Sequence, residues 1–178
     1  REGQYVALTY EGGEYHGAPA DLDHALDVPN STCIGDERGM VAFVEHVLAA
    51  LWATAISDVR IIADGPEIPL LDGSALPWYE ASAAAGRKQL DHDWRPLELS
   101  EPIFVLRDNA AIVALPDDRP LLSYALRHDH RMIGHQFAQF DTACHSFAFS
   151  LAPARTFATE AELAQLRQAG LIVAGTEE

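Results

Sequence analysis

The feature that most constrains this fold is a long helical pattern set between strand-like segments. Apolar residues recur at spacings of three and four from residue 41 to residue 55, with no Gly or Pro between them. This periodicity predicts an amphipathic helix. Runs rich in β-branched and aromatic residues at 5–10, 31–34 and 59–63 predict strands on both sides of it. A chain that mixes the two in this order predicts an α+β fold.

The second half of the chain repeats the order of strands followed by a helix. A second helix is predicted at residues 76–85, ending at Gly86, and the polar residues 87–96 read as a linker. Further strands are predicted at residues 103–106, 110–115, 121–126, 137–140 and 146–151, and a helix at 160–168 whose N-cap Thr159 and Glu162 form a capping-box pattern. We therefore predict two similar two-layer α/β sandwich domains, residues 1–95 and 96–178, each a sheet covered by helices. The second domain is expected to be incomplete in this chain.

Composition limits the partners and the compartment. The chain has 27 acidic residues against 12 Lys and Arg, a net charge of -15, so its surface repels phosphate backbones and nucleic acid is not an expected partner. No apolar run approaches the roughly 20 residues of a membrane helix. Cys33 and Cys144 lack metal-type spacing and fit a reducing cytoplasm at least as well as a single disulfide. We expect a cytoplasmic protein.

Glu45 and His46 are two adjacent ionisable residues inside the predicted helix. A histidine can give a neutral ring nitrogen to a metal, and a carboxylate beside it can take a proton from water. Spacing alone favours the simpler alternative of a solvent-facing Glu and a hydrogen-bonded structural His.

Other polar clusters have simple alternatives as well. His128 and His130 would face one side of a strand and form a metal site, or else end a polar strand. The hydroxyl of Thr156 and the ring of Phe157 follow a Pro turn, and such a pair can orient a carbonyl and stack on a sugar. Acidic residues next to glycines in the segment 64–74 usually satisfy turn backbone.

Four motifs of the chain, taken in order, resemble those of one enzyme family. They are residues 44–51 (VEHVLAAL), 64–75 (DGPEIPLLDGSA), 130–136 (HRMIGHQ) and 152–157 (APARTF). They are similar to the segments VEHLLAAL, GPEIPILDGSA, HPAIGRQ and APARTF of the UDP-3-O-acyl-N-acetylglucosamine deacetylases. The resemblance covers nearly the whole chain from about residue 28 onward.

The resemblance implies a zinc enzyme that removes the N-acetyl group from a UDP-linked acylated amino sugar on the way to lipid A. It implies two similar α+β domains with the Zn²⁺ site at their junction, and we expect a monomer. It assigns His46 as a zinc ligand and Glu45 as the general base, and Thr156 as the group that stabilises the oxyanion. Three substrate-side residues complete the assignment: Phe157 against the sugar, Cys33 close to the metal, and Glu162 where the family usually has Asp.

The same resemblance places the rest of the site outside this chain. The other two zinc ligands, a His and an Asp one helical turn apart, are expected beyond residue 178, together with a lysine and a second catalytic histidine. The chain is therefore expected to be part of a longer protein, because a catalytic zinc site needs about three protein ligands. Two rival hypotheses stay open: a non-catalytic relative that binds a nucleotide sugar or a partner, and a small metal-binding module built on His128 and His130.

Overall fold

The first half of the chain holds two three-stranded sheets. The computed structural model describes residues 5–11, 14–28, 31–91, 97–142 and 145–168, and none of the helices found there has the length and apolar character to span a membrane. One sheet has the order β2-β1-β6, in which β1 (Tyr5–Glu11) pairs antiparallel with β2 (Glu14–Pro19) and parallel with β6 (Val59–Ala63). The strands predicted at 5–10 and 59–63 are thus confirmed.

The second sheet comes just before α1 (Glu45–Ala53) in the chain and contains Cys33. After a short 3-10 helix, η1 (Leu22–His24), it has the order β3-β4-β5 and is antiparallel throughout. Its strands are β3 (Ala25–Val28), β4 (Ser31–Asp36) and β5 (Gly39–Val41). Only glycine fits at position 35 in β4. A Cβ there would lie 2.4 Å from the carbonyl oxygen of Gly39 in the neighbouring strand β5.

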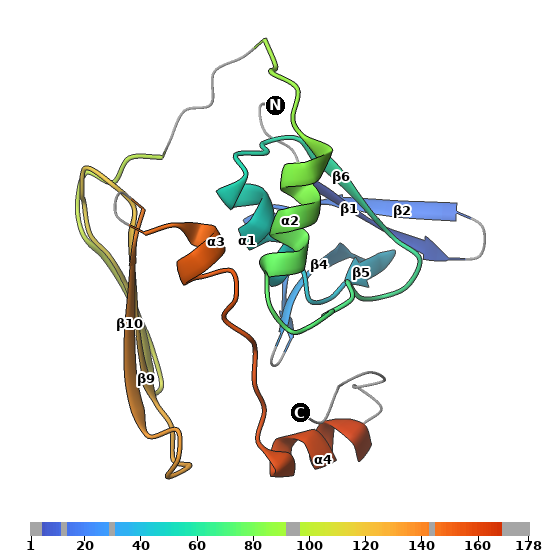
Figure 1. Ribbon diagram of the computed structural model, residues 1–178. Coiled ribbons are helices and arrows are strands. Elements are labelled where there is room, and N and C mark those ends of the chain that lie inside the picture. The colour runs from blue at the N-terminus through green and yellow to red at the C-terminus, as the bar shows by residue number, and fades with distance from the viewer. Residues whose placement is uncertain (1–4, 12–13, 29–30, 92–96, 143–144, 169–178) are drawn as a thin grey trace.

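The two helices of this half lie side by side over the sheets (Figure 1). The first, α1 (Glu45–Ala53), begins four residues after the predicted start at residue 41, and that part of the prediction is wrong. Val41 ends β5 instead. Ala42 then pairs with the segment 66–68, and Phe43 has a positive φ of 59°, so no helix can form there. The second, α2 (Leu76–Ala85), has the predicted bounds and ends at Gly86, whose φ is 71°.

A single apolar cluster holds these elements together. Its buried members are Ala18, Ile34, Val41, Val44, Val47, Leu51, Ala63 and Ile68. They come from both sheets, from α1 and from the loop after β6. Burying side chains of this size stabilises the fold by about 1.5–3 kcal/mol each, so α1 is fixed mainly by its inner face.

The second half forms two separate antiparallel hairpins. One pairs β7 (Ile103–Arg107) with β8 (Ala110–Ala114), and the other pairs β9 (Leu121–Arg127) with β10 (His135–Asp141). Large apolar side chains are exposed on both hairpins, including Phe104, Ile112 and Phe137. The strand predicted at 146–151 is wrong, because α3 (Phe147–Ser150) is helical. The last helix, α4 (Glu160–Gln168), has the predicted bounds.

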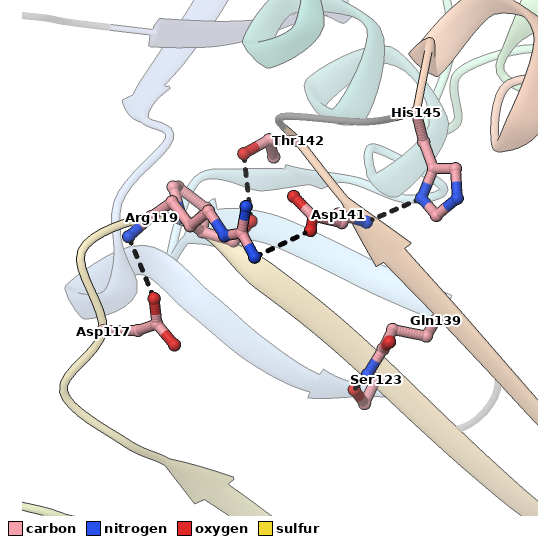
Figure 2. A network of polar contacts seen from close by, with 8 residues as sticks. Asp117, Arg119, Ser123, Gln139, Asp141, Thr142 and His145 are labelled. Carbon is pink, nitrogen blue, oxygen red and sulfur yellow. Dashed lines mark hydrogen bonds and ion pairs between the residues drawn. The ribbon is translucent and has the colours of Figure 1, made fainter.

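A polar network fixes the corner between β10 and α3 (Figure 2). Arg119 forms an ion pair with Asp141 (Nη2 to Oδ2, 3.2 Å), and the Thr142 hydroxyl donates to the carbonyl of Pro120 (3.0 Å). The amide of Asp141 donates to Nδ1 of His145 (2.9 Å). These contacts hold the start of α3 against the hairpin, and α3 leads directly into the segment that contains Thr156.

The α+β class is confirmed, since the described residues form small sheets with few helices. They give four sheets instead of one per predicted domain. The division into two sandwich domains stays a prediction.

Candidate functional site

Glu45 is the first residue of α1, and the backbone of β4 holds its carboxylate. The amide of Thr32 donates to Glu45 Oε2 (3.0 Å), and the amide of Val44 donates to the Thr32 carbonyl (3.2 Å). Val44 is buried in the apolar cluster and anchors this corner. Within the described residues Oε1 of Glu45 has no recorded partner. One carboxylate oxygen is therefore oriented by the backbone and the other is left to accept a proton.

His46 and Cys33 lie in the two elements that this hydrogen bond joins. His46 is partly buried in the first turn of α1, and Cys33 is fully buried in β4. The Cys33 thiol is free of any disulfide and lies 3.2 Å from the Ser31 hydroxyl. Imidazole nitrogen and thiolate sulfur are both donors that Zn²⁺ accepts.

The described residues do not supply all the ligands of a metal site. The portion of the chain that the structure describes gathers no group of three or more His, Cys, Asp and Glu side chains able to hold a metal ion. A catalytic zinc site needs about three protein ligands. His46 can supply one of them, so the chemistry fits zinc only if other donors join it from outside the described residues.

Thr156 lies in the segment after α3, away from α1 in the sequence. Its amide donates to the carbonyl of Gly73 (2.8 Å), and Arg155 Nε donates to the carbonyl of Asp72 (2.7 Å). The amide of Ala75 donates to the carbonyl of Ala152 (3.1 Å). These hydrogen bonds therefore join the segment 152–156 to the loop 72–75 of the first half. No hydrogen bond of the Thr156 hydroxyl is recorded among the described residues.

Ser74 is the buried polar residue of this loop, with none of its surface exposed. Its amide and its hydroxyl both donate to Oδ1 of Asp72 (3.0 and 2.8 Å), and its hydroxyl accepts from the amide of Leu76 (3.2 Å). These bonds from Ser74, with the nearby charge of Arg155, hold the pKa of the Asp72 carboxyl below its usual range. The sequence predicts a turn here and places Asp72 and Ser74 in one of the four family motifs, but it assigns neither residue a role in the site.

Phe157 and Glu162 lie beyond Thr156, next to the turn of the β9–β10 hairpin. Phe157 is 59% exposed, and its ring centroid lies 6.1 Å from that of His128. Glu162 completes the predicted capping box, because its Oε2 accepts from both the amide and the hydroxyl of Thr159 (2.7 Å each). Those bonds, helped by His128, hold the pKa of Glu162 below its usual range. The ring of Phe157 and the carboxylate of Glu162 thus both lie near His128.

His128 and His130 belong to the turn after β9 and are not in a strand. Nδ1 of His128 accepts from the amide of His130 (3.0 Å), and Nδ1 of His130 accepts from the amide of Met132 (3.4 Å). Their ring centroids are 6.4 Å apart. Both rings thus serve the turn backbone, which favours the polar strand-end alternative.

The structure gathers the candidate residues into two groups. Cys33, Glu45 and His46 share the junction of β4 and α1, while Thr156 and Phe157 lie between α3 and α4 and Glu162 lies in the first turn of α4. No contact between the two groups is recorded in the described residues. The loop 64–75, one of the four family motifs, binds Ala42 shortly before Glu45 at one end and Thr156 at the other.

Comparison with known proteins agrees with the motifs. The family profile described as UDP-3-O-acyl N-acetylglycosamine deacetylase matches residues 2–178. The chain is 38% identical over 163 residues to the UDP-3-O-acyl-N-acetylglucosamine deacetylase of Synechocystis sp., which covers 90% of this chain and 59% of that protein. It is 31% identical over 172 residues to the enzyme of that name from Leptospira biflexa, covering 96% of this chain and 57% of the relative.

The enzyme of the same name from Nostoc sp. is 36% identical over 163 residues, covering 89% of this chain and 58% of that protein. The chain thus spans less than two thirds of the length of these relatives. The resemblance seen in the four motifs is confirmed along nearly all of the 178 residues. The chain belongs to the UDP-3-O-acyl N-acetylglycosamine deacetylase family.

Proposed function

We propose that the protein is a zinc-dependent hydrolase that removes the N-acetyl group from UDP-3-O-acyl-N-acetylglucosamine, a reaction of lipid A synthesis. Family membership and the names of its relatives support this substrate. The observation that carries the proposal is the Glu45 carboxylate at the start of α1, next to His46 in the sequence. The amide of Thr32 donates to its Oε2 (3.0 Å) and holds it in place. An oriented carboxylate next to a metal-type donor is what amide hydrolysis by activated water requires.

Each candidate residue has a role in this proposal. Glu45 takes the proton of the attacking water at Oε1, since its Oε2 is engaged with Thr32. The Thr156 hydroxyl donates a hydrogen bond to the acetyl oxygen as negative charge develops on it. Phe157 packs against the sugar, Glu162 lies on the substrate side, and Cys33 lies near the metal.

His46 would supply one ligand to Zn²⁺, and the remaining ligands would come from outside the described residues. When bound, zinc would polarise the acetyl carbonyl and lower the pKa of the attacking water. The rest of the proposal concerns what this chain's own residues do: orient the base, donate to the oxyanion and bind the sugar.

We also propose that the protein works as a monomer in the cytoplasm and does not bind nucleic acid. The unpaired thiol of Cys33 fits a reducing compartment, and the net charge of -15 disfavours a phosphate backbone. The boundary between the two domains is placed at residues 95–96.

The test replaces Glu45 by Gln in the zinc-loaded protein of natural length. The amide keeps an oxygen to accept from Thr32 but cannot take a proton, so deacetylation should fall by about 10²–10⁴-fold while the zinc content stays the same. Zinc is measured by atomic emission and activity by release of acetate. His46→Ala, in contrast, should lower the zinc content itself.

Glu80→Gln is the matched control, because Glu80 is an exposed glutamate of α2 and belongs to neither group of candidate residues. It should leave both readouts unchanged. Full activity in Glu45→Gln would refute the assignment of the base. Loss of zinc on replacing His128 and His130 by Ala would favour the small metal module, and sugar-nucleotide binding without zinc or activity in the wild type would favour a non-catalytic relative.

A further inference from the structure

The loop 64–75 is fixed at one end to the segment that leads into α1. Ala42, three residues before Glu45, donates its amide to the carbonyl of Pro66 (2.8 Å) and accepts from the amide of Ile68 (2.9 Å). Ile68 is buried in the apolar cluster. This end of the loop is therefore rigidly tied to the part of the fold that carries Glu45 and His46.

The other end of the loop holds Thr156. The Gly73 carbonyl accepts from the Thr156 amide (2.8 Å), and a Cβ placed on Gly73 would lie 3.6 Å from Cγ2 of Thr156. The methyl group of Thr156 therefore lies on the side of Gly73 where a side chain would point. A β-branched side chain has few χ1 choices, so placing the methyl there also fixes where the hydroxyl points.

The direction of the Gly73 carbonyl depends on its two neighbours. Asp72 and Ser74 are locked together across Gly73 by the two bonds from Ser74 to Oδ1 of Asp72. Gly73 has a φ of 82°, which glycine adopts freely, so glycine's own conformational preference does little to fix the turn, and the bonds between its neighbours restrain it. Ser74 is completely buried; its hydroxyl donates to Asp72 within this turn and accepts from the amide of Leu76 at the start of α2.

We propose that Ser74, acting with Asp72, is a positioning residue that sets the place of the Thr156 hydroxyl relative to Glu45. It touches neither substrate nor metal. The bonds between Ser74 and Asp72 fix the Gly73 carbonyl, which accepts from the Thr156 amide. The same loop is bonded to Ala42, just before α1, so it fixes the position of Thr156 relative to Glu45. The inference rests on the proposed deacetylase function and extends it to residues that the site itself does not contain.

The experiment uses the zinc-loaded protein of natural length and the variants Ser74→Ala, Thr156→Val and their combination. Ser74→Ala should lower kcat about 10- to 100-fold, the range that a misplaced catalytic group produces, while KM changes less than about threefold. In the Thr156→Val background the same change should alter kcat less than about twofold, because no hydroxyl remains to be misplaced. An equal loss of kcat in both backgrounds would overturn the proposal, since a general structural defect acts on both.

Ser57→Ala is the matched control. Its hydroxyl also donates to a neighbouring carboxylate, Oδ2 of Asp58 (2.7 Å), but in the connection between α1 and β6 and not in the loop 64–75. It should leave kcat unchanged. A loss of kcat in Ser57→Ala equal to that in Ser74→Ala would also count against the proposal.

A second pair of variants serves if Ser74→Ala does not fold. Asp72→Asn retains an oxygen that can accept both bonds from Ser74 and should keep most of kcat, while Asp72→Ala loses that oxygen and should behave like Ser74→Ala. Equal activity in these two variants would refute the role of the lock. The proposed function is tested separately by Glu45→Gln, so that function can stand when the positioning role fails.

Discussion

Glu162 is held in its charged form at the N-terminus of α4. Its carboxylate accepts from the amide and the hydroxyl of Thr159 (2.7 Å each), and the Thr159 hydroxyl accepts from the Glu162 amide (3.3 Å). The partial positive charge of a helix N-terminus favours the carboxylate as well. Because these contacts favour the ionised group, the pKa of Glu162 in the folded protein lies below its usual range.

The lowered pKa predicts how the cap responds to acid. The stabilisation by Glu162 is fully present above the pKa of the unfolded chain, about 4.3, and is lost as the pH falls through the lower folded value. The amide resonance of Thr159, which donates to this carboxylate, should therefore titrate with a midpoint below about 4.3. In Glu162→Gln that titration should disappear. A midpoint at or above the usual glutamate value would contradict the capping geometry.

At the same scale, the sequence alone predicted part of the candidate site. The pattern around Thr159 was enough to predict the capping box, because both partners lie within four residues of each other. The Thr32–Glu45 bond joins residues 13 apart and needs the packing of β4 against α1, so no local pattern revealed it. The roles of Glu45, His46 and Thr156 came from the family resemblance and remain predictions.

At the scale of elements, α1 depends on its buried face. Leu51 is 4% exposed and packs in the apolar cluster, whereas Leu22 in η1 is 92% exposed. Leu51→Ala should lower the free energy of unfolding by about 2–5 kcal/mol, from lost burial and the cavity left behind. Leu22→Ala should change it by less than about 0.5 kcal/mol. Urea unfolding of both variants measures the difference, and similar values for the two would show that α1 is not part of the core.

The elements that the sequence predicted well are those whose signals are local. Gly86 and the helical pattern before it gave the bounds of α2, and the strands of both hairpins were found within a residue or two. The start of α1 was missed because Ala42 pairs with a loop more than 20 residues away. The segment 146–151 was misread because a short apolar run has no period that separates strand from helix.

At the scale of the whole molecule, the two halves are unequal. Every member of the buried apolar cluster lies between residues 18 and 68, while the hairpins β7–β8 and β9–β10 expose much of their apolar surface. Figure 1 shows the β9–β10 hairpin well apart from the sheets of the first half. The halves meet where the loop 72–75 binds residues 152–156, where the ring of Tyr79 approaches Phe147 (centroids 5.6 Å apart), and where exposed Arg107 pairs with Asp27 (3.6 Å). The first half should therefore fold without the second.

Lys88 allows this to be tested with a single cut. It is the only lysine of the chain, and it is exposed between α2 and β7, close to the proposed domain boundary. A lysine-specific protease should cut the native 178-residue chain after Lys88, since exposed connecting segments are preferred cleavage sites. Lys88→Arg keeps the charge but should block the cut. The purified fragment 1–88 contains the entire described apolar cluster and should retain a cooperative urea transition. A fragment that unfolds without a transition would mean that the core needs the second half, and the boundary at residues 95–96 would then have to be abandoned.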